Sequence, residues 1–564
     1  MMSVEAAPAD ESPSTSPDPK REPSDAASSL VGNSLTGSTW TLVSRITGLA
    51  RIVVIGAVLG ATYLGNTYQG INALPNLVYY QLLAGSLFIS LLVPPLVRHI
   101  REGNRERADA LVRGFLGSVL GLALVAMLAL VAAGPPILHL LSLGVSDAGS
   151  AAAQRRVGLL LLVLFAPQIL LYVVAGTGAA VMNAHGRFAL AAAAPTVENL
   201  GIILTLVLAW IMFGSGIALS DVSTSEVVLL GVGTTSAVGL HAALQWLGAR
   251  RHEITMYPRA GWRDSEIRSL LGRMRSVLAY TGLAALQLFA TIVVANRVAG
   301  GLVAFQLALN FFYLPIAIVT WPVARALMPR LANFHQTGQM HTFRDEFLRA
   351  MGLASFVAVP VAVAYALSAS SIAHAVAFGR LDTPMATKYM AVSMIALSPA
   401  VIGETWFTLG SQALYSQQNA RAPLRSMTLR AAITMLLMVP AWVAHGALVL
   451  VLLGVALSGG SLAGALHVCR QANSRLPSTE YSLLRSLGRT AVASAIMVVP
   501  ASLAWVGLGG FAGSKPGDLV RLTVAVLVGA ATFLALQARL NAPEIALVRA
   551  GVARFAVRLR RGEV

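Results

Sequence analysis

The hydrophobic positions of this chain form long, nearly unbroken runs, unlike the alternating or short amphipathic patterns of a soluble domain. Apolar runs of about 20 residues, long enough to cross a bilayer as an α-helix, recur from Ser38 almost to the C-terminus. They predict an all-α polytopic membrane protein with about 14 transmembrane helices. The predicted spans are 37–61, 67–97, 114–134, 157–183, 190–213, 227–249, 276–296, 302–328, 350–376, 389–415, 426–444, 446–468, 490–511 and 522–538.

Composition and charge fit the same class of protein. Charged residues make up 12% of the 564 residues, about half the ~25% of a soluble domain. The net charge is +17, but most Lys and Arg fall in the loops that are cytoplasmic if the N-terminus is inside. Arg430, near the inner end of its span, is counted with the loop before it. The basic charge therefore predicts a topology with both termini cytoplasmic, and no nucleic-acid partner.

The two ends of the chain differ from the apolar middle. Residues 1–36 are rich in Pro, Ser, Asp and Ala and have no apolar face, so we expect a disordered cytoplasmic tail. Residues 541–564 place apolar side chains at helical spacing with arginines between them. This pattern predicts a basic amphipathic segment lying on the anionic inner leaflet, with an unstructured basic tail as the alternative.

An internal repeat is visible in the spacing of Pro and Gly. Residues 92–117 align with 327–352 at an offset of 235. Further along, Pro167 and Gly178 correspond to Pro399 and Gly410 at an offset of 232, and each pair joins spans of equal rank. Six spans separate the copies, so both copies have the same orientation.

The repeat divides the chain into units. We expect a first six-helix bundle at 37–249, a basic cytoplasmic linker at 250–275 and a second six-helix bundle at 276–468. Two extra transmembrane helices would follow within 469–540. Two bundles in parallel repeat are expected to surround a central cavity that opens to alternate sides of the membrane.

Two arginines in the first span are the main candidate chemistry. An arginine at the middle of a membrane helix costs roughly 2.5–3.5 kcal/mol or more, a cost that a water-filled cavity largely removes. Arg51 falls near mid-membrane and is expected to face such a cavity, where it can meet an anion. Arg45 lies nearer the inner end, so snorkelling to the interface is an equal alternative for it.

Other polar residues within the spans leave alternatives open. Glu198 and Glu404 are candidates for carrying a coupling proton or cation, or for pairing with an arginine, although a helix-packing hydrogen bond is the simpler interpretation. Interhelical hydrogen bonding and cavity lining are equally open for four amide side chains, Gln287, Asn296, Gln306 and Asn310.

Signals of an enzyme are missing from the sequence. There is no nucleotide-binding glycine loop, no metal-ligand spacing and no supported Ser/His/Asp arrangement, and Cys469 is the only cysteine. We therefore expect no enzymatic activity, no cofactor and no metal site.

Several motifs, in order, resemble the MurJ/MviN family of the multidrug/oligosaccharidyl-lipid/polysaccharide exporter superfamily. These are "LVSRITGLAR", "NALPNL", "APQILLY", "MNAHGRF", "GVGTTSAVGLHA" and "ALMPRL", spread over about residues 33–430. The resemblance implies a flippase that moves lipid II, a lipid-linked sugar pyrophosphate, from the inner to the outer leaflet of the bacterial cytoplasmic membrane by alternating access. It also implies membrane lipids as surroundings and peptidoglycan synthesis as the process served.

The resemblance can be carried to individual residues. Arg45 and Arg51 match the two arginines of the family's S-R-x-x-G-x-x-R pattern. At three further positions the family has a charged residue and this chain does not: Asn66 replaces an Asp, and Tyr79 and Asn310 replace arginines. The resemblance thus implies that these five residues contact the substrate, in a divergent member of the family.

The divergence keeps other functions open. The first alternative is a flippase for another polyprenyl-linked glycan, and a small-molecule antiporter of the same superfamily is another. The last is a non-transporting membrane scaffold that recruits cell-wall synthesis proteins through its basic loops.

Overall fold

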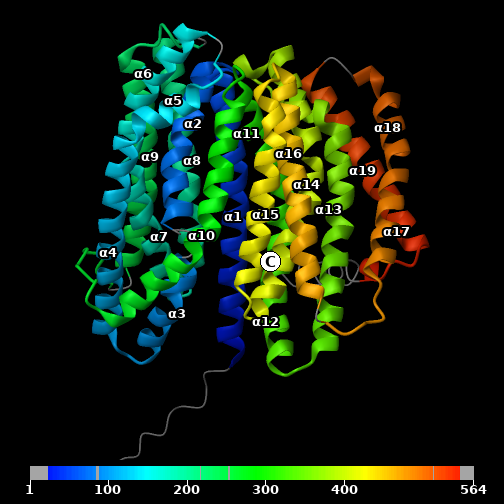
Figure 1. Ribbon diagram of the computed structural model, residues 1–564, viewed down its shortest axis with the longest axis horizontal. Helices are drawn as coiled ribbons and strands as arrows, with labels where there is room; N and C mark the ends of the chain where they lie inside the picture. Colours follow the sequence, from blue (N-terminus) through cyan, green and yellow to red (C-terminus); the bar gives the residue numbers. More distant parts are fainter. Residues whose placement is uncertain are drawn as a thin grey trace, which may run out of the picture.

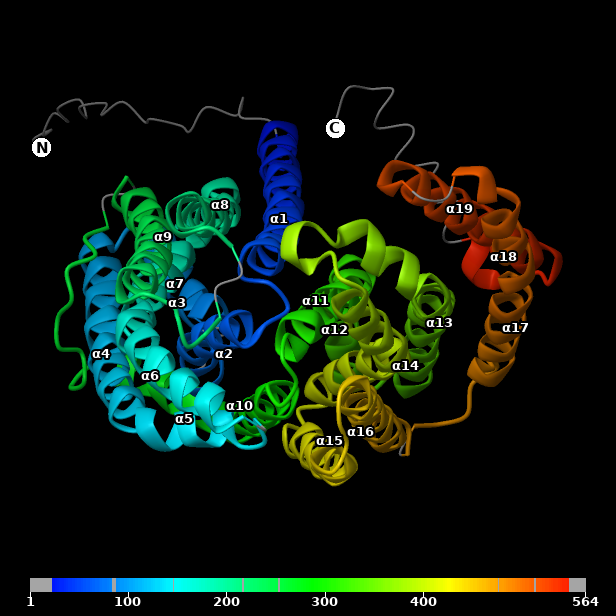
Figure 2. The same ribbon diagram turned by 90° about the horizontal axis from the view of Figure 1, so that it is seen from above.

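Helices make up all the regular structure in the part of the chain that the computed structural model describes. That part is residues 23–546 without 84–87, 146, 216–217, 252–253, 475 and 512–513, with side chains from Thr39 onward except at 275–276. Two groups of upright helices stand side by side, with α17–α19 beyond the second group (Figures 1 and 2). The predicted all-α polytopic fold is confirmed.

The first group comprises nine α-helices and one π-helical turn, η1. Their bounds are α1 Pro23–Leu59, α2 Tyr63–Leu77, η1 Val78–Leu82, α3 Phe88–Arg101, α4 Arg105–Ala132, α5 Gly134–Ser142, α6 Ala148–Phe165, α7 Gln168–Ala184, α8 Phe188–Phe213 and α9 Thr224–Arg250.

The second group and the extra helices follow the linker. Their bounds are α10 Ser265–Ala295, α11 Gly301–Pro315, η3 Ile316–Thr320, α12 Trp321–Gln336, α13 Met340–Val376, η4 Gly379–Leu381, α14 Pro384–Ser416, α15 Arg421–Met438, η5 Val439–Trp442, α16 Ala447–Asn473, α17 Leu483–Ile496, α18 Val498–Gly507, η6 Gly509–Phe511 and α19 Lys515–Arg539.

Among the described residues, 13 helical stretches are long and apolar enough to cross a membrane. The predicted span 67–97 is not among them because it is divided into α2, η1 and α3. Pro75 lies in the last turn of α2, where its missing N–H and its ring disturb the hydrogen-bond ladder, and the π-helical turn follows. Pro315 precedes η3 in the same way, so both halves have a proline-linked π turn in the same kind of helix.

The first helix corrects one boundary. α1 begins at Pro23, so residues 23–36 of the predicted disordered tail are helical. Proline suits the first turn of a helix, and the long membrane helix supplies the nucleus that a short isolated helix lacks. Residues 1–22 lie outside the described residues, as does 547–564, which is most of the predicted amphipathic segment.

Glycines bring helices together at corresponding places in the two halves. The close contacts, glycine first and then the residue that an added Cβ would meet, are Gly178 with Gln245, Gly410 with Val468, Gly231 with Leu164, and Gly454 with Ala396. Leu164 on α6 and Gly178 on α7 each lie 232 positions before their counterparts on α14. Gly231 and Gln245 on α9 each lie 223 positions before their counterparts on α16. The halves therefore pack these helices in the same register, as the repeat predicted.

The linker between the halves is held against α4. The guanidinium of Arg107 donates two hydrogen bonds to the carboxylate of Asp264, at 2.6 and 3.0 Å. Asp264 also caps α10 by accepting from the backbone N–H of Glu266. The backbone of Arg259 donates to the carbonyl of Arg113, 3.0 Å away.

We expect the variant Asp264→Asn to release the linker while keeping the cap, because Asn is an equally good N-cap. The bonds from Arg107 hold the pKa of Asp264 below its ordinary value. Their stabilisation is therefore complete above the unfolded pKa of about 3.9, and is lost only as the pH falls through the lower, folded pKa. Trypsin should cut 250–264 faster in Asp264→Asn at neutral pH, whereas Asp345→Asn, at a separate exposed pair with Arg349, should not change that cleavage. Equal cleavage of the wild type and Asp264→Asn would contradict the clamp.

The two predicted extra spans are present: α17 and α18 together form the stretch Leu483–Gly507, and α19 forms Lys515–Arg539. They pack on the outer side of the second bundle, where α17 and α19 contact α13 and α18 pairs with α19. An apolar cavity of about 460 Å3 lies between α13, α18 and α19, with Phe356, Met497 and Phe533 among its walls.

Candidate substrate-binding site

Two polar cavities adjoin between the halves. The first, of about 300 Å3, is lined by Arg51 and by side chains of α2, η1, α10 and α11. The second, of about 200 Å3, lies toward α14, α15 and α16 and contains Glu404 and Arg430. Gln81 and Leu288 line both, so the cavities meet at these two side chains.

Arg51 reaches the first cavity from α1 with unused hydrogen-bond donors. Its Nη1 lies 3.6 Å from Oε1 of Glu198, which is an ion pair but longer than a hydrogen bond. Its Nε is buried and has no hydrogen-bond partner among the described residues. The arginine is thus neutralised electrostatically by a residue from α8, while 25% of its side chain stays exposed where it lines the first cavity.

Glu198 is held by its own half of the molecule. Tyr172 donates its hydroxyl proton to Oε1 over 3.0 Å, and Nδ1 of His241 lies 2.7 Å from Oε2. The carboxylate is therefore fixed by α7 and α9, independently of Arg51. Of the alternatives for this acid, pairing with an arginine is the one observed, and helix-packing hydrogen bonds accompany it.

The second half contains a tighter pair. Nη1 of Arg430 donates to Oε2 of Glu404 over 2.6 Å, with 14% and 19% of the two side chains exposed. Arg430 also lines the second cavity. The interpretation that placed this arginine with the basic cytoplasmic loop is therefore wrong. A favourable ion partner one helix away explains how this arginine is kept inside the bundle.

The hydrogen-bonded pair Tyr172–Glu198 of the first half and the ion pair Glu404–Arg430 of the second half occupy equivalent positions in the repeat, but their charges differ. Adding the offset of 232 to Tyr172 gives Glu404, and adding it to Glu198 gives Arg430. A tyrosine–acid hydrogen bond in one half thus corresponds to an acid–arginine ion pair in the other. This offset is the sequence signal that could have identified Arg430.

The neighbouring helix is adapted to each pair. With the offset of 223 that relates α9 to α16, His241 corresponds to Gly464. A Cβ at Gly464 would lie 2.8 Å from the Cβ of Arg430. Glycine thus leaves room for the arginine in the second half, where the first half has a histidine bonded to an acid.

Polar residues of α2 and η1 form one wall of the first cavity. They are Gln69, Asn72, Asn76, Tyr80 and Gln81. The first four are three or four residues apart, a helical stripe that is visible in the sequence but was not recognised. The π turn then adds the side chain of Gln81 to the same wall.

Arg45 lies apart from the residues that line these cavities. Its guanidinium carbon is 5.4 Å from the centroid of the Trp321 ring on α12, a cation–π contact. This contact joins the two halves below Arg51, toward the start of α1. Arg45 is therefore less directly placed for a ligand than Arg51.

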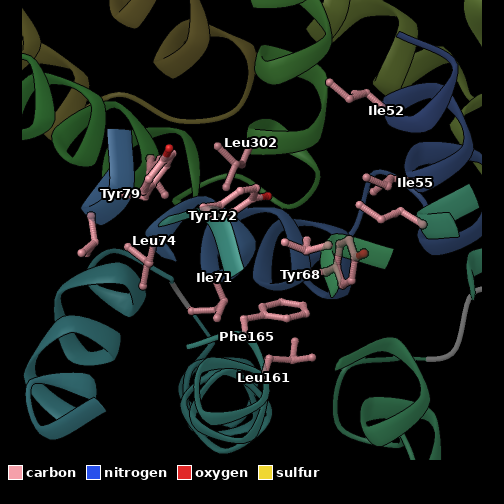
Figure 3. Packing of buried hydrophobic residues seen from close by; sticks show 14 of the residues in the cluster. Ile52, Ile55, Tyr68, Ile71, Leu74, Tyr79, Leu161, Phe165, Tyr172 and Leu302 are labelled. Carbon is pink, nitrogen blue, oxygen red and sulfur yellow. The ribbon is translucent and has the colours of Figure 1, made fainter. Parts of the chain in front are cut away.

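Tyr79 is part of the packed core. Its ring stacks on that of Tyr172, with centroids 5.4 Å apart, and only 3% of it is exposed. Figure 3 shows both rings among the buried side chains of the first half. The next residue, Tyr80, is the one that lines the cavity.

Asn66 joins the halves instead of lining the cavities. Its Nδ2 donates to the carbonyl of Val298 over 2.8 Å, and its Oδ1 accepts from the backbone N–H of Leu302 over 3.1 Å. It thereby caps the first turn of α11. With its amide used in this way, Asn66 does not enter the binding site proposed below.

The remaining amide side chains show both cavity lining and hydrogen bonding. Gln287 and Gln306 line the cavities, and Gln287 also donates to the hydroxyl of Thr434 on α15 over 3.4 Å. Asn310, half-buried one turn from Gln306, donates to that residue's carbonyl over 2.8 Å. Asn296 is buried and bonds to Gln154 and to the carbonyl of Leu141, so it serves interhelical hydrogen bonding.

The halves close against each other at the end of the bundle opposite the linker. There α1 contacts η4 and α11, and α2 contacts α11. Gly300, at φ +71°, would place a Cβ against Ala61, and Gly379, at φ +53°, would place one against Ala57. These close backbone approaches hold the two halves together at this end.

The family model described as "Lipid II flippase MurJ" matches residues 55–520. The chain belongs to this family. "Probable lipid II flippase MurJ" of Rhizobium tropici is 22% identical over 93% of this chain and 97% of its own. "Lipid II flippase MurJ" of Burkholderia cenocepacia is 23% identical over 69% of this chain and 74% of its own.

Solved structures agree with the MurJ fold. A lipid II flippase MurJ in an inward closed conformation superposes with a TM-score of 0.69 at 17% identity, covering 90% of this chain and 99% of that one. Inward- and outward-facing multidrug transporters of the MATE family give TM-scores of 0.59 and 0.53, at 15% and 16% identity. These cover 78% and 79% of this chain and 97% and 95% of theirs. MurJ is a family of membrane transporters and not of enzymes.

Proposed function

We propose that this protein moves lipid II from the inner to the outer leaflet of the bacterial cytoplasmic membrane. The observation that carries the proposal is Arg51, a cavity-facing guanidinium that is neutralised by Glu198 without being used up by it. Membership of the MurJ family and the names of its relatives supply the substrate class.

The chemistry of the cavities suits such a substrate. A diphosphate offers oxygens that a planar guanidinium binds through paired N–H groups. Amides that line the first cavity, such as Asn72, Asn76 and Gln306, can donate to and accept from sugar hydroxyls and peptide groups. The polyprenyl chain can stay in the bilayer while the polar head occupies the cavities.

Alternating access is the mechanism that we propose for the movement. The halves meet closely at the end opposite the linker, through the Asn66 cap and the approaches at Gly300 and Gly379. Opening these contacts and closing the other end would expose the same cavities to the other side. The occurrence of related folds in inward- and outward-facing forms supports this mechanism.

A flippase for another polyprenyl-linked glycan is the second candidate. Among the described residues that line the two cavities, Arg51 and Arg430 are the cations, and Arg430 is tightly paired. Tyr79 and Asn310 stand where the family resemblance implies arginines. A less cationic cavity favours a substrate with fewer acidic groups beyond its diphosphate.

Reconstitution into liposomes discriminates these functions. Lipid II, or an undecaprenyl-diphosphate-linked neutral glycan, is placed in both leaflets, and an enzyme added outside measures the accessible fraction over time. We expect lipid II to become fully accessible with the protein and to stay near half accessible without it. Exclusive movement of the neutral glycan would establish the second candidate, and movement of neither would favour a non-transporting scaffold.

The proposed orientation has its own test. The linker and the start of α1 lie at the same end of the bundle (Figure 1), and we propose that this end faces the cytoplasm. A cysteine at the exposed position Ala260 should resist an impermeant maleimide in intact cells and react after permeabilisation. Labelling in intact cells would show that this end faces outward, opposite to the proposed orientation.

A further inference from the structure

The imidazole ring of His241, in the first half, has neighbours that can bond to it whether it carries one proton or two. The residue lies on α9 with 6% of its surface exposed. Its Nδ1 is 2.7 Å from the Glu198 carboxylate, and its Nε2 is 3.5 Å from the amide nitrogen of Gln245. With Glu198 ionised, Nδ1–H donates to the carboxylate, and Nε2 of the neutral ring accepts from the amide.

The surroundings also provide for a proton on Nε2. Oε1 of Gln245 is buried and has no hydrogen-bond partner among the described residues, while its Nε2 also donates to the carbonyl of Ala191 over 3.1 Å. Turning the terminal amide by half a turn exchanges its oxygen and nitrogen. The oxygen would then accept from a protonated Nε2–H, at the cost of the bond to the carbonyl of Ala191. Both N–H groups of an imidazolium would have acceptors, from Glu198 and Gln245.

The net charge around His241 depends on whether Arg51 stays paired with Glu198. The helices that pack against α9 are α6, α7 and α8, and behind them lie α1, α2 and η1. The charged and titratable side chains described on these elements are Arg45 and Arg51 on α1, Tyr63 and Tyr68 on α2, Tyr79 and Tyr80 on η1, Arg155 and Arg156 on α6, Tyr172 on α7 and Glu198 on α8, with Glu226 and Arg250 on α9 itself. Of these, Arg155 and Arg156 bond to Ser142 and Ser220, in and near the loops beyond the start of α6. Without substrate, Arg51, Glu198 and neutral His241 sum to zero charge.

We propose that His241 is a proton-binding group linked to anion binding at Arg51. A diphosphate that takes the donors of Arg51 withdraws the cation from Glu198 and adds negative charge nearby. Both changes favour an imidazolium beside Glu198, so a proton is taken up at Nε2. Linkage is reciprocal, so acidic pH must strengthen anion binding. This inference rests on the proposed function only in taking a diphosphate as the anion.

The second half provides an internal contrast. Gly464 stands at the position of His241, and Arg430 is bonded directly to Glu404. His467, the histidine nearby on α16, bonds instead to Ser426 and Gln471. Neither of these partners is a carboxylate, which makes His467→Gln a matched control for His241→Gln.

The test uses the full-length protein in nanodiscs with an undecaprenyl-diphosphate-linked sugar as the probe. Both phosphates of this probe are esterified, so its charge is constant over the working range of about pH 5.5 to 8, where histidine titrates. Affinity is measured across the range, and proton uptake is followed with an indicator in weak buffer.

We expect the wild type to take up protons on binding and to bind more tightly at acidic pH, by up to about tenfold per pH unit. His241→Gln should bind with an affinity independent of pH and without proton uptake, while His467→Gln should behave as the wild type. Gln245→Leu removes the acceptor for Nε2–H and should shift the pH profile to lower pH, an effect that a purely structural role would not produce.

Binding by the wild type without proton uptake would overturn the inference, as would an unchanged pH dependence in His241→Gln. If His241→Gln does not fold, an unshifted profile in Gln245→Leu overturns it. The proposed function fails separately, if Arg51→Ala binds the probe as tightly as the wild type.

Discussion

Bacteria that depend on this protein should stop growing when Arg51 is replaced by Ala, although the variant still reaches the membrane. Folding should persist because Glu198 keeps its bonds from Tyr172 and His241 when the arginine is removed. Substrate binding should fail because hydrogen bonds to charged groups are worth about 1.5–3 kcal/mol each. That corresponds to a loss of roughly 10- to 100-fold in affinity.

Two variants refine this prediction. Arg51→Lys should retain part of the activity, because Lys keeps the charge and loses the planar fork. Arg45→Ala should be milder, because Arg45 contacts Trp321 instead of lining the cavities. Complementation of a flippase-depleted strain, with membrane levels of each variant checked, measures these effects. Full activity of Arg45→Ala/Arg51→Ala at normal abundance would give both arginines a structural role.

The second large effect concerns stability. Glu404→Gln should lower the free energy of unfolding of the second half by about 3 kcal/mol, because it leaves the guanidinium of Arg430 without its counter-charge. The double variant Glu404→Gln/Arg430→Gln should recover most of this loss, since no uncompensated charge remains. Thermal unfolding of detergent-solubilised protein, followed by the reactivity of Cys469 at the contact of α16 with α14, measures both.

The matched variant in the first half is Glu198→Gln. It should destabilise the protein less, because Arg51 is 25% exposed to the cavity and its contact with Glu198 is 3.6 Å long. A Glu404→Gln variant with wild-type stability but no transport would contradict the structural role and would place the second pair in the transport cycle.

Much of the fold could be predicted from the sequence because bilayer-spanning helices are long and uniformly apolar. The repeat was readable because Gly178 and Gly410 serve the same purpose, a close approach between helices that excludes larger side chains. The division of the span 67–97 was not predicted. Pro75 alone does not distinguish a kinked helix from one that changes to a π turn.

The site was predictable only in part. The depth of Arg51 in its span indicated a cavity-facing residue, and the structure places it there. The hydrogen-bond and ion-pair partners of the polar side chains could not be predicted, because they lie on elements far apart in the sequence. Asn66 caps a helix of the other half, and Arg430 finds its acid on α14. Residue spacing within one helix carries no information about such contacts.

Equilibrium binding of lipid II to the purified protein measures how much Arg51 contributes to substrate binding. The wild type, Arg51→Lys and Arg51→Ala are compared in nanodiscs at one pH, with His467→Gln as the control. We expect a loss of affinity of at least about tenfold for Arg51→Ala, an intermediate affinity for Arg51→Lys and no change for the control. Equal affinity of Arg51→Ala and the wild type would contradict this expectation.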